Sequence, residues 1–257
     1  MLNNHNTMHK TDHNQSEKHT RERFQLKETI VTITSEKRYI PAAKDAVRSC
    51  RSDLENFIRK DPFFAITLDK YRSVHPNTPE IAGRMIEAAN RFGIGPMSAV
   101  AGTIASMAVE AMVDAGATYA IVDNGGDIAM INDETVIVGI YAGESATGIS
   151  IGLEIEPTDS IIGICTSSGR IGHSISFGNA DAVTILSGDV SLADAAATAV
   201  GNAVNGEASI EEAFSIVSGV ESITGCLIII GEHIGVYGSV RIVEAPQRPE
   251  YITGAWI

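Results

Sequence analysis

One segment of the sequence, SLADAAATAVGNAV (residues 191–204), places a carboxylate and a hydroxyl within an otherwise apolar run. Asp194 and Thr198 are four positions apart, so in a helix their side chains project from one face about one turn apart. Mg²⁺ takes oxygen ligands and keeps places for water and phosphate, which makes this pair a candidate metal site. A structural role is the alternative, with Asp194 near the positive end of the helix dipole and Thr198 bonded to the preceding turn.

A second segment, VDNGGDIAM (residues 122–130), has two glycines between short apolar runs. Asn-Gly is a strong β-hairpin signal, because both central residues of the favoured turn need positive φ. The backbone amides of Gly125 and Gly126 can face an anion, and Asp123 and Asp127 flank them. An ordinary hairpin without a ligand is the simpler interpretation, and the residue types alone favour it.

A third segment, CTSSGRIGHS (residues 165–174), follows an apolar stretch and combines hydroxyl groups with a cation and an imidazole. Arg170 is one of 5 cationic residues after position 75 and a candidate partner for a phosphate or carboxylate. A Ser–His pair involving His173 lacks both the G-x-S-x-G pattern of a nucleophile elbow and an identifiable orienting carboxylate. A polar turn, in which Ser167 and Ser168 cap local amides, is the alternative.

Apolar periodicity predicts both helices and strands around these segments. Helices are expected at residues 43–60, between Pro79 and Gly93, and at 98–115, 192–204 and 210–217. Strands are expected within 24–33 and at 119–123, 128–131, 136–141, 149–155, 161–165, 182–186, 226–230, 234–237 and 239–243. The pattern predicts an α+β fold, with helices packed on a largely antiparallel sheet. A helix followed by a hairpin occurs at 98–131 and again at 192–243, which suggests an internal duplication of this unit.

Length and composition favour one folded domain behind a polar tail. The chain has 257 residues, 44% of them hydrophobic and 20% charged, which is enough apolar material for a buried core. Residues 1–23 have almost nothing to bury, so we expect a disordered tail followed by a single domain at 24–257. His5, His9 and His13 fall four apart in this tail. We favour a solvated tail over a metal site, because no packed element holds their rings in place.

Charge is unevenly distributed along the chain. Residues 1–75 hold 14 Lys/Arg and 10 Asp/Glu, whereas residues 76–257 hold 5 Arg, no Lys and 22 Asp/Glu, and the net charge is −13. This balance disfavours nucleic acid as the main ligand, because binding its phosphates requires cations. It is compatible with a divalent ion that bridges carboxylates to a small phosphorylated ligand.

The sequence predicts a soluble, cytoplasmic protein without membrane contact. The polar N-terminus has no apolar centre of a secretory signal. The longest purely aliphatic stretch, residues 227–230, is far shorter than the ~20 residues that span a bilayer. Three cysteines without close spacing support neither a disulfide framework nor a zinc ribbon.

Taken in order, these segments resemble the ApbE superfamily, the magnesium-dependent FAD:protein FMN transferases. Residues 102–127 resemble the family's stretch from a Gly-Tyr-Ala helix start to its Asn-x-Gly-Gly-Asp/Asn hairpin. Residues 166–169 look like its Thr-Ser-Gly segment, and residues 193–199 are similar to its Ala-Asp-Ala-x-x-Thr-Ala helix. The segments at 93–102 and 165–183 are more similar still to a shorter, archaeal branch of the superfamily. The resemblance implies an ApbE-like α+β fold.

The resemblance also implies a site. Asp194, Thr198 and the backbone carbonyl of Val100 would bind Mg²⁺, and His173 and Asp127 are candidate catalytic residues. The implied reaction is FMN transfer to a protein hydroxyl, or cleavage of the FAD pyrophosphate by water. The implied partners are a small phosphorylated ligand and a protein substrate, and both monomer and homo-oligomer remain open. FAD or another nucleotide would be bound by Asn124, Gly125, Gly126, Asp127, Thr166, Ser167, Ser168, Gly169 and Arg170.

Three departures from the family pattern support an alternative function. Ala101 occupies the position of the family's Lys, no Asp-Pro follows His173 as in the family's His-Ile-x-Asp-Pro segment, and the exported transferases' lipoprotein signal is missing. Loss of the Lys removes a phosphate contact, which leaves open whether the protein is an enzyme. The alternative is a non-catalytic or accessory protein on the same fold, in archaeal sulfur assimilation around homocysteine formation. Cys165 would then handle sulfur, although a small buried apolar residue is its simpler interpretation.

Overall fold

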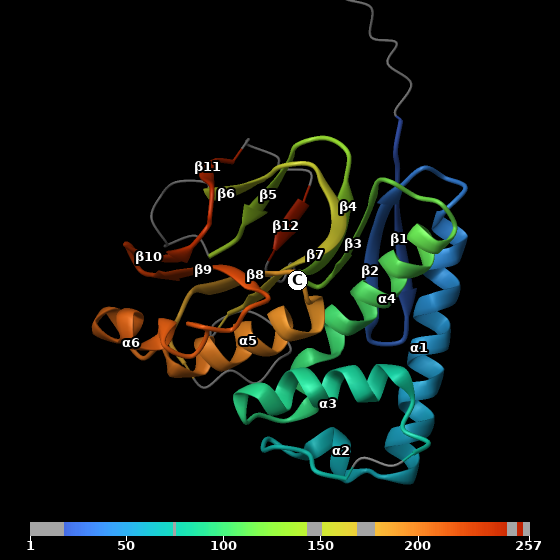
Figure 1. The fold of residues 1–257 in the computed structure, drawn as a ribbon, viewed down its shortest axis with the longest axis horizontal. Coiled ribbons are helices and arrows are strands. Elements are labelled where there is room, and N and C mark those ends of the chain that lie inside the picture. The colour runs from blue at the N-terminus through green and yellow to red at the C-terminus, as the bar shows by residue number, and fades with distance from the viewer. Residues whose placement is uncertain (1–17, 74–75, 143–150, 169–177, 246–250, 254–257) are drawn as a thin grey trace, which may run out of the picture.

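Three layers build the protein: a layer of helices, a large antiparallel sheet and a small second sheet (Figure 1). The structure is a computed structural model that describes residues 18–73, 76–142, 151–168 and 178–245, together with the strand at 251–253. The α+β class and the packing of helices on a largely antiparallel sheet are confirmed.

The helices begin and end at residues whose chemistry favours a boundary. Pro41 lies in the first turn of α1, where its missing N–H has no helical partner to lose. Gly93 ends α3 in a left-handed conformation with a φ of 78°. The Asp189 side chain caps α5 by accepting a hydrogen bond from the Leu192 amide at 3.0 Å. The helices are α1 Ile40–Lys60, α2 Phe63–Ile66, α3 Glu80–Phe92, α4 Val100–Asp114, α5 Val190–Ala203 and α6 Ile210–Phe214, with 3₁₀ turns at Pro96–Ala99 and Glu207–Ser209.

Two sheets are formed by the described residues. The large sheet has the order β1-β2-β3-β4-β7-β8-β9-β10, with antiparallel neighbours throughout. The small sheet has the order β11-β6-β5-β12, and β12 runs parallel to β5. The large sheet comprises β1 Thr20–Leu26, β2 Thr29–Ser35, β3 Ala120–Asn124, β4 Asp127–Asn132, β7 Thr158–Ser167, β8 Ala182–Ser187, β9 Ile223–Ile230 and β10 His233–Gly238. The small sheet comprises β5 Val136–Ile140, β6 Ile151–Ile155, β11 Ile242–Glu244 and β12 Tyr251–Thr253.

Alternate residues of the central strands face opposite layers, which produces two apolar cores. In β4, Ala129 and Ile131 pack beneath the helices, whereas Ile128 and Met130 pack against the small sheet. Helices α1, α4 and α5 cover the first face of the large sheet, α3 packs on these helices, and the small sheet lies against the second face (Figure 1). Strand alternation therefore sends Asp127, two positions before Ala129, toward the helices.

Helix α4 lies inside the helical layer. Together with the preceding 3₁₀ turn it forms a 19-residue segment, Pro96–Asp114, that is long and apolar enough to cross a membrane by length and composition. More than half of this segment's most apolar window, 56%, is buried inside the protein, where α4 packs against α1, α5, β3 and β4. Such burial is what the core helix of a folded domain requires, so the apolar composition of α4 is explained by packing.

Two predicted boundaries are wrong. β1 begins at Thr20, so residues 20–23 belong to the sheet and not to a tail. The hydrophobic pattern does not predict the start of this strand because it lies at the edge of the sheet, where three of its seven residues are exposed and none is buried. β7 runs to Ser167, so Thr166 and Ser167 belong to a strand and not to a loop. Their hydroxyls obscure the strand signal, although the Thr166 and Thr184 hydroxyl oxygens lie 2.8 Å apart across β7 and β8.

Other expectations are only partly met. The periodicity predicts neither the one-turn helix α2 nor strand β12, and α6 ends at Phe214 instead of Val217. The internal duplication is not confirmed. His5, His9 and His13 lie outside the described residues.

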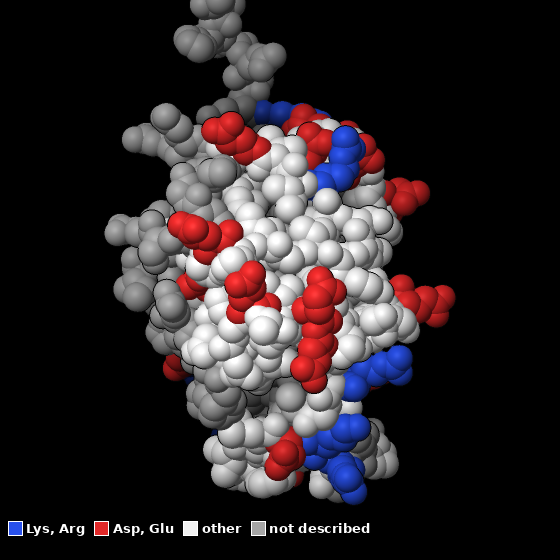
Figure 2. All heavy atoms as spheres, turned by 90° about the vertical axis from the view of Figure 1, so that its left-hand side faces the viewer, with Lys and Arg blue, Asp and Glu red and all other residues white. Residues whose placement is uncertain are grey.

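Charge on the molecule follows the imbalance counted in the sequence. Figure 2 shows the left-hand side of Figure 1, where acidic side chains are spread over a mainly uncharged face and basic side chains lie toward its margins. Helix α6 alone contributes Glu211 and Glu212 in its first turn. Helix α6 belongs to the part of the chain after residue 75, which is rich in Asp and Glu.

Candidate functional site

The candidate site lies where the β3–β4 hairpin and the end of β7 meet the first turns of α4 and α5. Asp127 on β4 is paired directly with Cys165 on β7, and Cys165 belongs to the core on the helix side of the sheet. Asp194 on α5 is close enough to Asp127 and Cys165 for its charge to raise the pKa of both. The fold thus brings together three groups that are far apart in the sequence.

Asp194 is held by the first turn of α4. Its Oδ2 accepts a hydrogen bond from the Gly102 amide at 2.8 Å, and the Ala101 amide also donates to this carboxylate. Burial raises the pKa of Asp194 to about 7, while these two hydrogen bonds act in the opposite direction. The carboxylate therefore faces the positive end of α4 and not that of its own helix, which Asp189 caps. The alternative interpretation, in which Asp194 stabilises the start of its own helix, is therefore wrong, because the helix start that Asp194 contacts is that of α4.

Asp127 lies in a strongly acidic environment. Burial raises the pKa of Asp127 well above its ordinary value, and the charges of Asp194 and Asp123 add to this effect. Hydrogen bonds from the Cys165 thiol and the Thr166 amide partly oppose it. Burial likewise raises the pKa of Asp123 to about 6. Carboxyl groups that repel each other in a buried site attract either protons or a cation.

The Cys165 thiol completes this group. Burial, followed by the charges of Asp127 and Asp194, raises the pKa of Cys165 well above its ordinary value. Its sulfur lies 3.6 Å from the Val190 carbonyl oxygen and within hydrogen-bonding reach of Asp127. The side chain is fully buried, as its simpler interpretation predicts.

Thr198 and Val100 are the other two predicted metal ligands. Thr198 is one turn further along α5 and is partly exposed. The described residues contain no bond from its hydroxyl to the preceding turn, in contrast to Thr103, whose hydroxyl donates to the Ala99 carbonyl at 2.6 Å. Val100 is the first residue of α4, directly before the two amides that contact Asp194. A hydroxyl, a carbonyl and a carboxylate are oxygen donors of the kind that Mg²⁺ prefers, and the role of these residues as metal ligands stays a prediction.

The predicted hairpin is confirmed. Gly125 and Gly126 join β3 to β4 with φ values of 69° and 104°. The Gly126 amide donates to Asp123 Oδ1 at 2.9 Å, and Asn124 Nδ2 donates to the Ala101 carbonyl at 3.0 Å. Both groups serve the local structure, since Asn124 ties the hairpin to the first turn of α4. Their roles in binding a cofactor stay predictions.

The predicted Thr-Ser-Ser-Gly-Arg segment is only partly described. Ser167 Oγ is buried without a hydrogen-bond partner among the described residues, and it lies two positions from Cys165 on the same face of β7. A buried hydroxyl of this kind is the group that a bound ligand or water would satisfy. Ser168 follows the strand, whereas Gly169, Arg170 and His173 lie outside the described residues.

Sequence reasoning missed the amides of Ala101 and Gly102 as partners of Asp194. The sequence feature that could have indicated these partners is Gly102. A Cβ at this position would lie 2.8 Å from the Asp194 Cβ and 2.9 Å from the Val190 carbonyl oxygen. Only a glycine allows α4 and α5 to approach so closely. A glycine inside a helix of small residues therefore marks the crossing point of the two helices.

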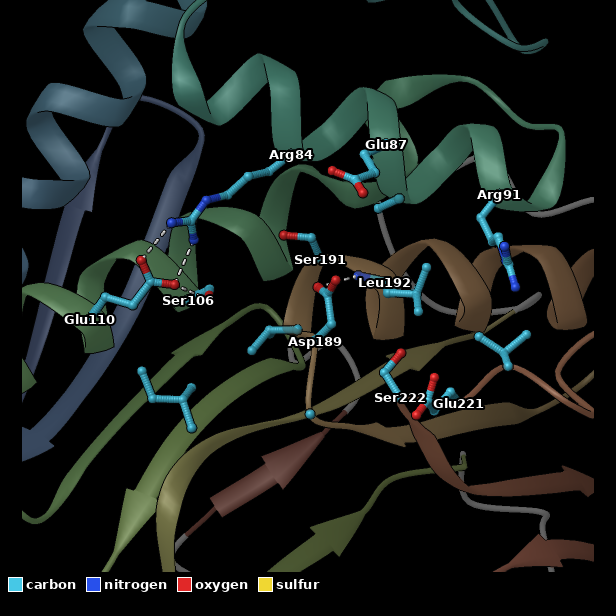
Figure 3. Close-up of a pocket in the computed structure, with 15 residues that line it drawn as sticks. Arg84, Glu87, Arg91, Ser106, Glu110, Asp189, Ser191, Leu192, Glu221 and Ser222 are labelled. Atoms are coloured by element: carbon cyan, nitrogen blue, oxygen red, sulfur yellow. Dashed lines mark hydrogen bonds and ion pairs between the residues drawn. The ribbon is translucent and has the colours of Figure 1, made fainter.

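A separate hollow of about 670 Å³ lies between α3, α4 and the start of α5 (Figure 3). Arg84 spans it and pairs with both oxygens of Glu110, at 2.5 and 2.8 Å, and Ser106 donates to the same carboxylate. Burial opposes these hydrogen bonds, which nevertheless lower the pKa of Glu110. Asp127 and Asp194 do not line this hollow, so it is distinct from the candidate site.

Comparison with known families identifies the chain. A family model described as AbpE bacteria matches residues 13–216. The chain belongs to this family. The UPF0280 protein of Methanosarcina barkeri is 58% identical to this AbpE family member over 238 residues, which cover 91% of the chain and 93% of that protein. The UPF0280 protein of Archaeoglobus fulgidus is 43% identical over 237 residues, covering 90% and 97%. These archaeal relatives confirm the predicted archaeal branch.

Solved structures with the same fold carry the name ApbE. The flavinyl transferase ApbE of Pseudomonas stutzeri has a TM-score of 0.56 and 10% identity, with 86% of this chain and 95% of that one covered. The flavin transferase ApbE of Vibrio cholerae has a TM-score of 0.51 and 14% identity, covering 86% and 97%. At such identities the likeness concerns the fold, and it confirms the ApbE-like fold that the sequence motifs imply.

Proposed function

We propose that this AbpE family member binds the pyrophosphate of FAD, or of a related nucleotide, together with Mg²⁺, and acts on that pyrophosphate. The observation that carries the proposal is the Asp194 carboxylate at the first turn of α4, with the Asp127 carboxyl beside it. Asp194, Thr198 and the Val100 carbonyl would hold the metal. The ApbE-like fold supports a flavin ligand, because the similar solved proteins are flavin transferases by name.

The metal and the side chains of the site would have different roles in the proposed reaction. Mg²⁺ held by Asp194, Thr198 and the Val100 carbonyl would neutralise charge on the phosphates and polarise them for attack. Burial raises the pKa of Asp127 well above its ordinary value, so its carboxylate is a stronger base than that of an exposed aspartate. Asp127 would accept the proton of an attacking protein hydroxyl or water as its oxygen bonds to the phosphorus of the FMN half. The bond from that phosphorus to the bridging oxygen then breaks, and AMP leaves with this oxygen.

A second candidate function is nucleotide binding without catalysis, as an accessory protein. Ala101 favours it, because a methyl group replaces the cation that the family places near the phosphates. The Ala101 amide is bonded to Asp194, and its carbonyl accepts a hydrogen bond from Asn124. The residue thus helps to build the first turn of α4 without adding charge to it.

Calorimetry with FAD, in the presence and absence of Mg²⁺, tests binding. We expect Mg²⁺-dependent binding that Asp194→Asn weakens at least tenfold. Asp114→Asn, which changes an exposed carboxylate at the other end of α4, is the matched control and should bind normally. Wild-type protein that binds FAD equally well with and without Mg²⁺, or an unaffected Asp194→Asn, would contradict the metal site.

Chromatography of FAD incubated with the protein and Mg²⁺ separates the two candidate functions. Formation of AMP, together with FMN either free or attached to protein, supports catalysis. Asp127→Asn should then abolish turnover while retaining binding. Mg²⁺-dependent binding without any AMP would favour the accessory role.

A further inference from the structure

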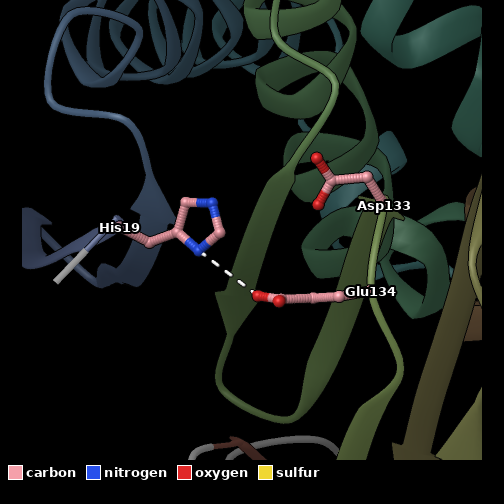
Figure 4. A group of neighbouring side chains, drawn as sticks. All are labelled: His19, Asp133 and Glu134. Carbon is pink, nitrogen blue, oxygen red and sulfur yellow. Dashed lines mark ion pairs between the residues drawn. The ribbon is translucent and has the colours of Figure 1, made fainter. Parts of the chain in front are cut away.

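A second group of metal-ligating side chains lies at the opposite end of the β3–β4 hairpin from the candidate site. His19 precedes β1, and Asp133 and Glu134 lie in the turn between β4 and β5 (Figure 4). One ligand atom from each of the three residues lies within 4.8 Å of the other two. Figure 4 shows the imidazole of His19 and both carboxylates directed into the space between them.

The His19 imidazole is mostly buried, and its two nitrogens have an unusual environment among the described residues. Only 11% of its side chain is exposed, and its Nε2 has no hydrogen-bond partner among the described residues. Its Nδ1 lies 3.7 Å from Glu134 Oε1, beyond hydrogen-bonding distance. The ring stacks on Tyr119, with centroids 3.8 Å apart and planes inclined by 5°, which fixes its orientation. The stacked ring therefore holds Nδ1 toward Glu134 at a separation too long for a hydrogen bond but suited to two ligands of one ion.

We propose that His19, Asp133 and Glu134 bind a divalent transition-metal ion, with Zn²⁺ as the best match. Nitrogen and oxygen ligands about 2.1 Å from one tetrahedral ion lie about 3.4 Å apart, close to the observed separation of Nδ1 and Oε1. One imidazole with two carboxylates suits Zn²⁺ better than Mg²⁺, which favours oxygen ligands alone. Three protein ligands leave a fourth position for water.

The ion would stabilise the start of the edge strand β1. β1 is the first strand of the large sheet, and β2 is its one partner among the described strands, so its start is weakly held. A bond from His19 to the β4–β5 turn would attach this start to a central part of the sheet. Metal that binds the folded chain alone stabilises it by mass action, so Zn²⁺ should raise the unfolding temperature.

The Lys18 ammonium would compete with the metal ion for the Asp133 carboxylate. Its ammonium lies 3.1 and 3.3 Å from the two carboxylate oxygens of Asp133. A carboxylate has about four lone-pair sites, so the ammonium and a metal can share it, although their charges repel. Removing the ammonium in Lys18→Gln should therefore strengthen Zn²⁺ binding.

Isothermal titration with Zn²⁺ tests the proposal, in a variant whose tail histidines His5, His9 and His13 are replaced by Ala. We expect one site, with binding at least tenfold weaker in His19→Phe, a variant that keeps a ring against Tyr119. Glu134→Gln, at an exposed side chain, should weaken binding similarly and serves if His19→Phe does not fold. His233→Ala is the matched control, because His233 also pairs with a carboxylate, Glu207, at 2.9 Å.

Equal Zn²⁺ binding by the His19, Glu134 and His233 variants would overturn the proposal. Displacement of Zn²⁺ by a large excess of Mg²⁺ would also overturn it, because the donor set would then lack the predicted selectivity. Asp194→Asn should leave Zn²⁺ binding unchanged, so this site and the proposed FAD–Mg²⁺ site succeed or fail separately.

Discussion

Asp194 Oδ2 and the backbone amide of Gly102 are joined by a 2.8 Å hydrogen bond across 92 positions of the chain. The bond connects the fifth residue of α5 to the first turn of α4. It depends on the absence of a side chain at Gly102, which lets the two helices meet. The packing of the core and the position of the candidate metal ligand therefore have the same cause.

Gly102→Ala should destabilise the protein. The new Cβ would lie 2.8 Å from the Asp194 Cβ and 2.9 Å from the Val190 backbone oxygen, and inserting a methyl into such a core costs about 1–3 kcal/mol. Urea unfolding measures the change. Gly83→Ala on α3 is the matched control, since a Cβ there has no atom within 4 Å, and it should be neutral or stabilising by about 1 kcal/mol. Equal effects of the two substitutions would contradict the close crossing of α4 and α5.

The metal-free protein should lose stability as the pH rises. Burial raises the pKa of Asp194 from 3.8 to about 7. Stability from the protonated form is fully present below the unfolded pKa of 3.8 and is lost as pH rises through about 7, because the unfolded chain then binds fewer protons. Asp127 and Asp123 shift in the same direction. Urea unfolding with EDTA should show a loss of roughly 2–3 kcal/mol between about pH 5 and about pH 8.

Two variants test whether Asp194 causes this pH dependence of stability. Asp194→Asn removes the group, so its free energy of unfolding should depend less on pH than that of the wild-type protein. Asp114→Asn, at an exposed carboxylate, should keep the wild-type slope. A slope that is unchanged in Asp194→Asn would show that another group titrates.

Local chemistry made the boundaries of several elements predictable. Pro41, Gly93 and Asp189 mark helix ends, and each acts through its own backbone or a neighbouring amide. The Asn-Gly-Gly-Asp turn was equally clear, because Gly125 and Gly126 supply the positive φ that the hairpin needs. Such signals lie within a few residues of the structure they determine, so one sequence is sufficient to find them.

Contacts across the fold could not be predicted in the same way. The spacing of Asp194 and Thr198 indicates a shared helix face, but it contains no information about which amides meet the carboxylate. The pairing of Asp127 with Cys165 depends on the register of β4 and β7. Thr166 and Ser167 resemble loop residues in the sequence because both carry hydroxyl groups. The assembled sheet determines the environment of each hydroxyl: that of Thr166 lies against Thr184, and that of Ser167 has no partner among the described residues.

Native protein should react slowly with thiol reagents. Cys50, Cys165 and Cys226 are all buried, and burial raises the pKa of Cys50 to about 11, that of Cys226 to about 12 and that of Cys165 well above its ordinary value. The thiolate is the reactive form, so native protein should show no fast thiol and unfolded protein three. Titration with a chromogenic disulfide measures both. One fast native thiol that disappears in Cys165→Ser would contradict this prediction and support a sulfur-handling role.

Glu110→Gln should destabilise the helical layer more than Glu80→Gln. Glu110 forms two hydrogen bonds with Arg84 across α4 and α3 and accepts one from Ser106, and its side chain is 34% exposed. Glu80 contacts the same guanidinium within α3 but is 65% exposed, where such pairs contribute little. We expect losses of about 1–2 kcal/mol for Glu110→Gln and about 0–0.5 kcal/mol for Glu80→Gln in urea unfolding. Equal losses would indicate that Arg84 does not depend on the cross-helix pair, and the hollow of Figure 3 would then be free to rearrange.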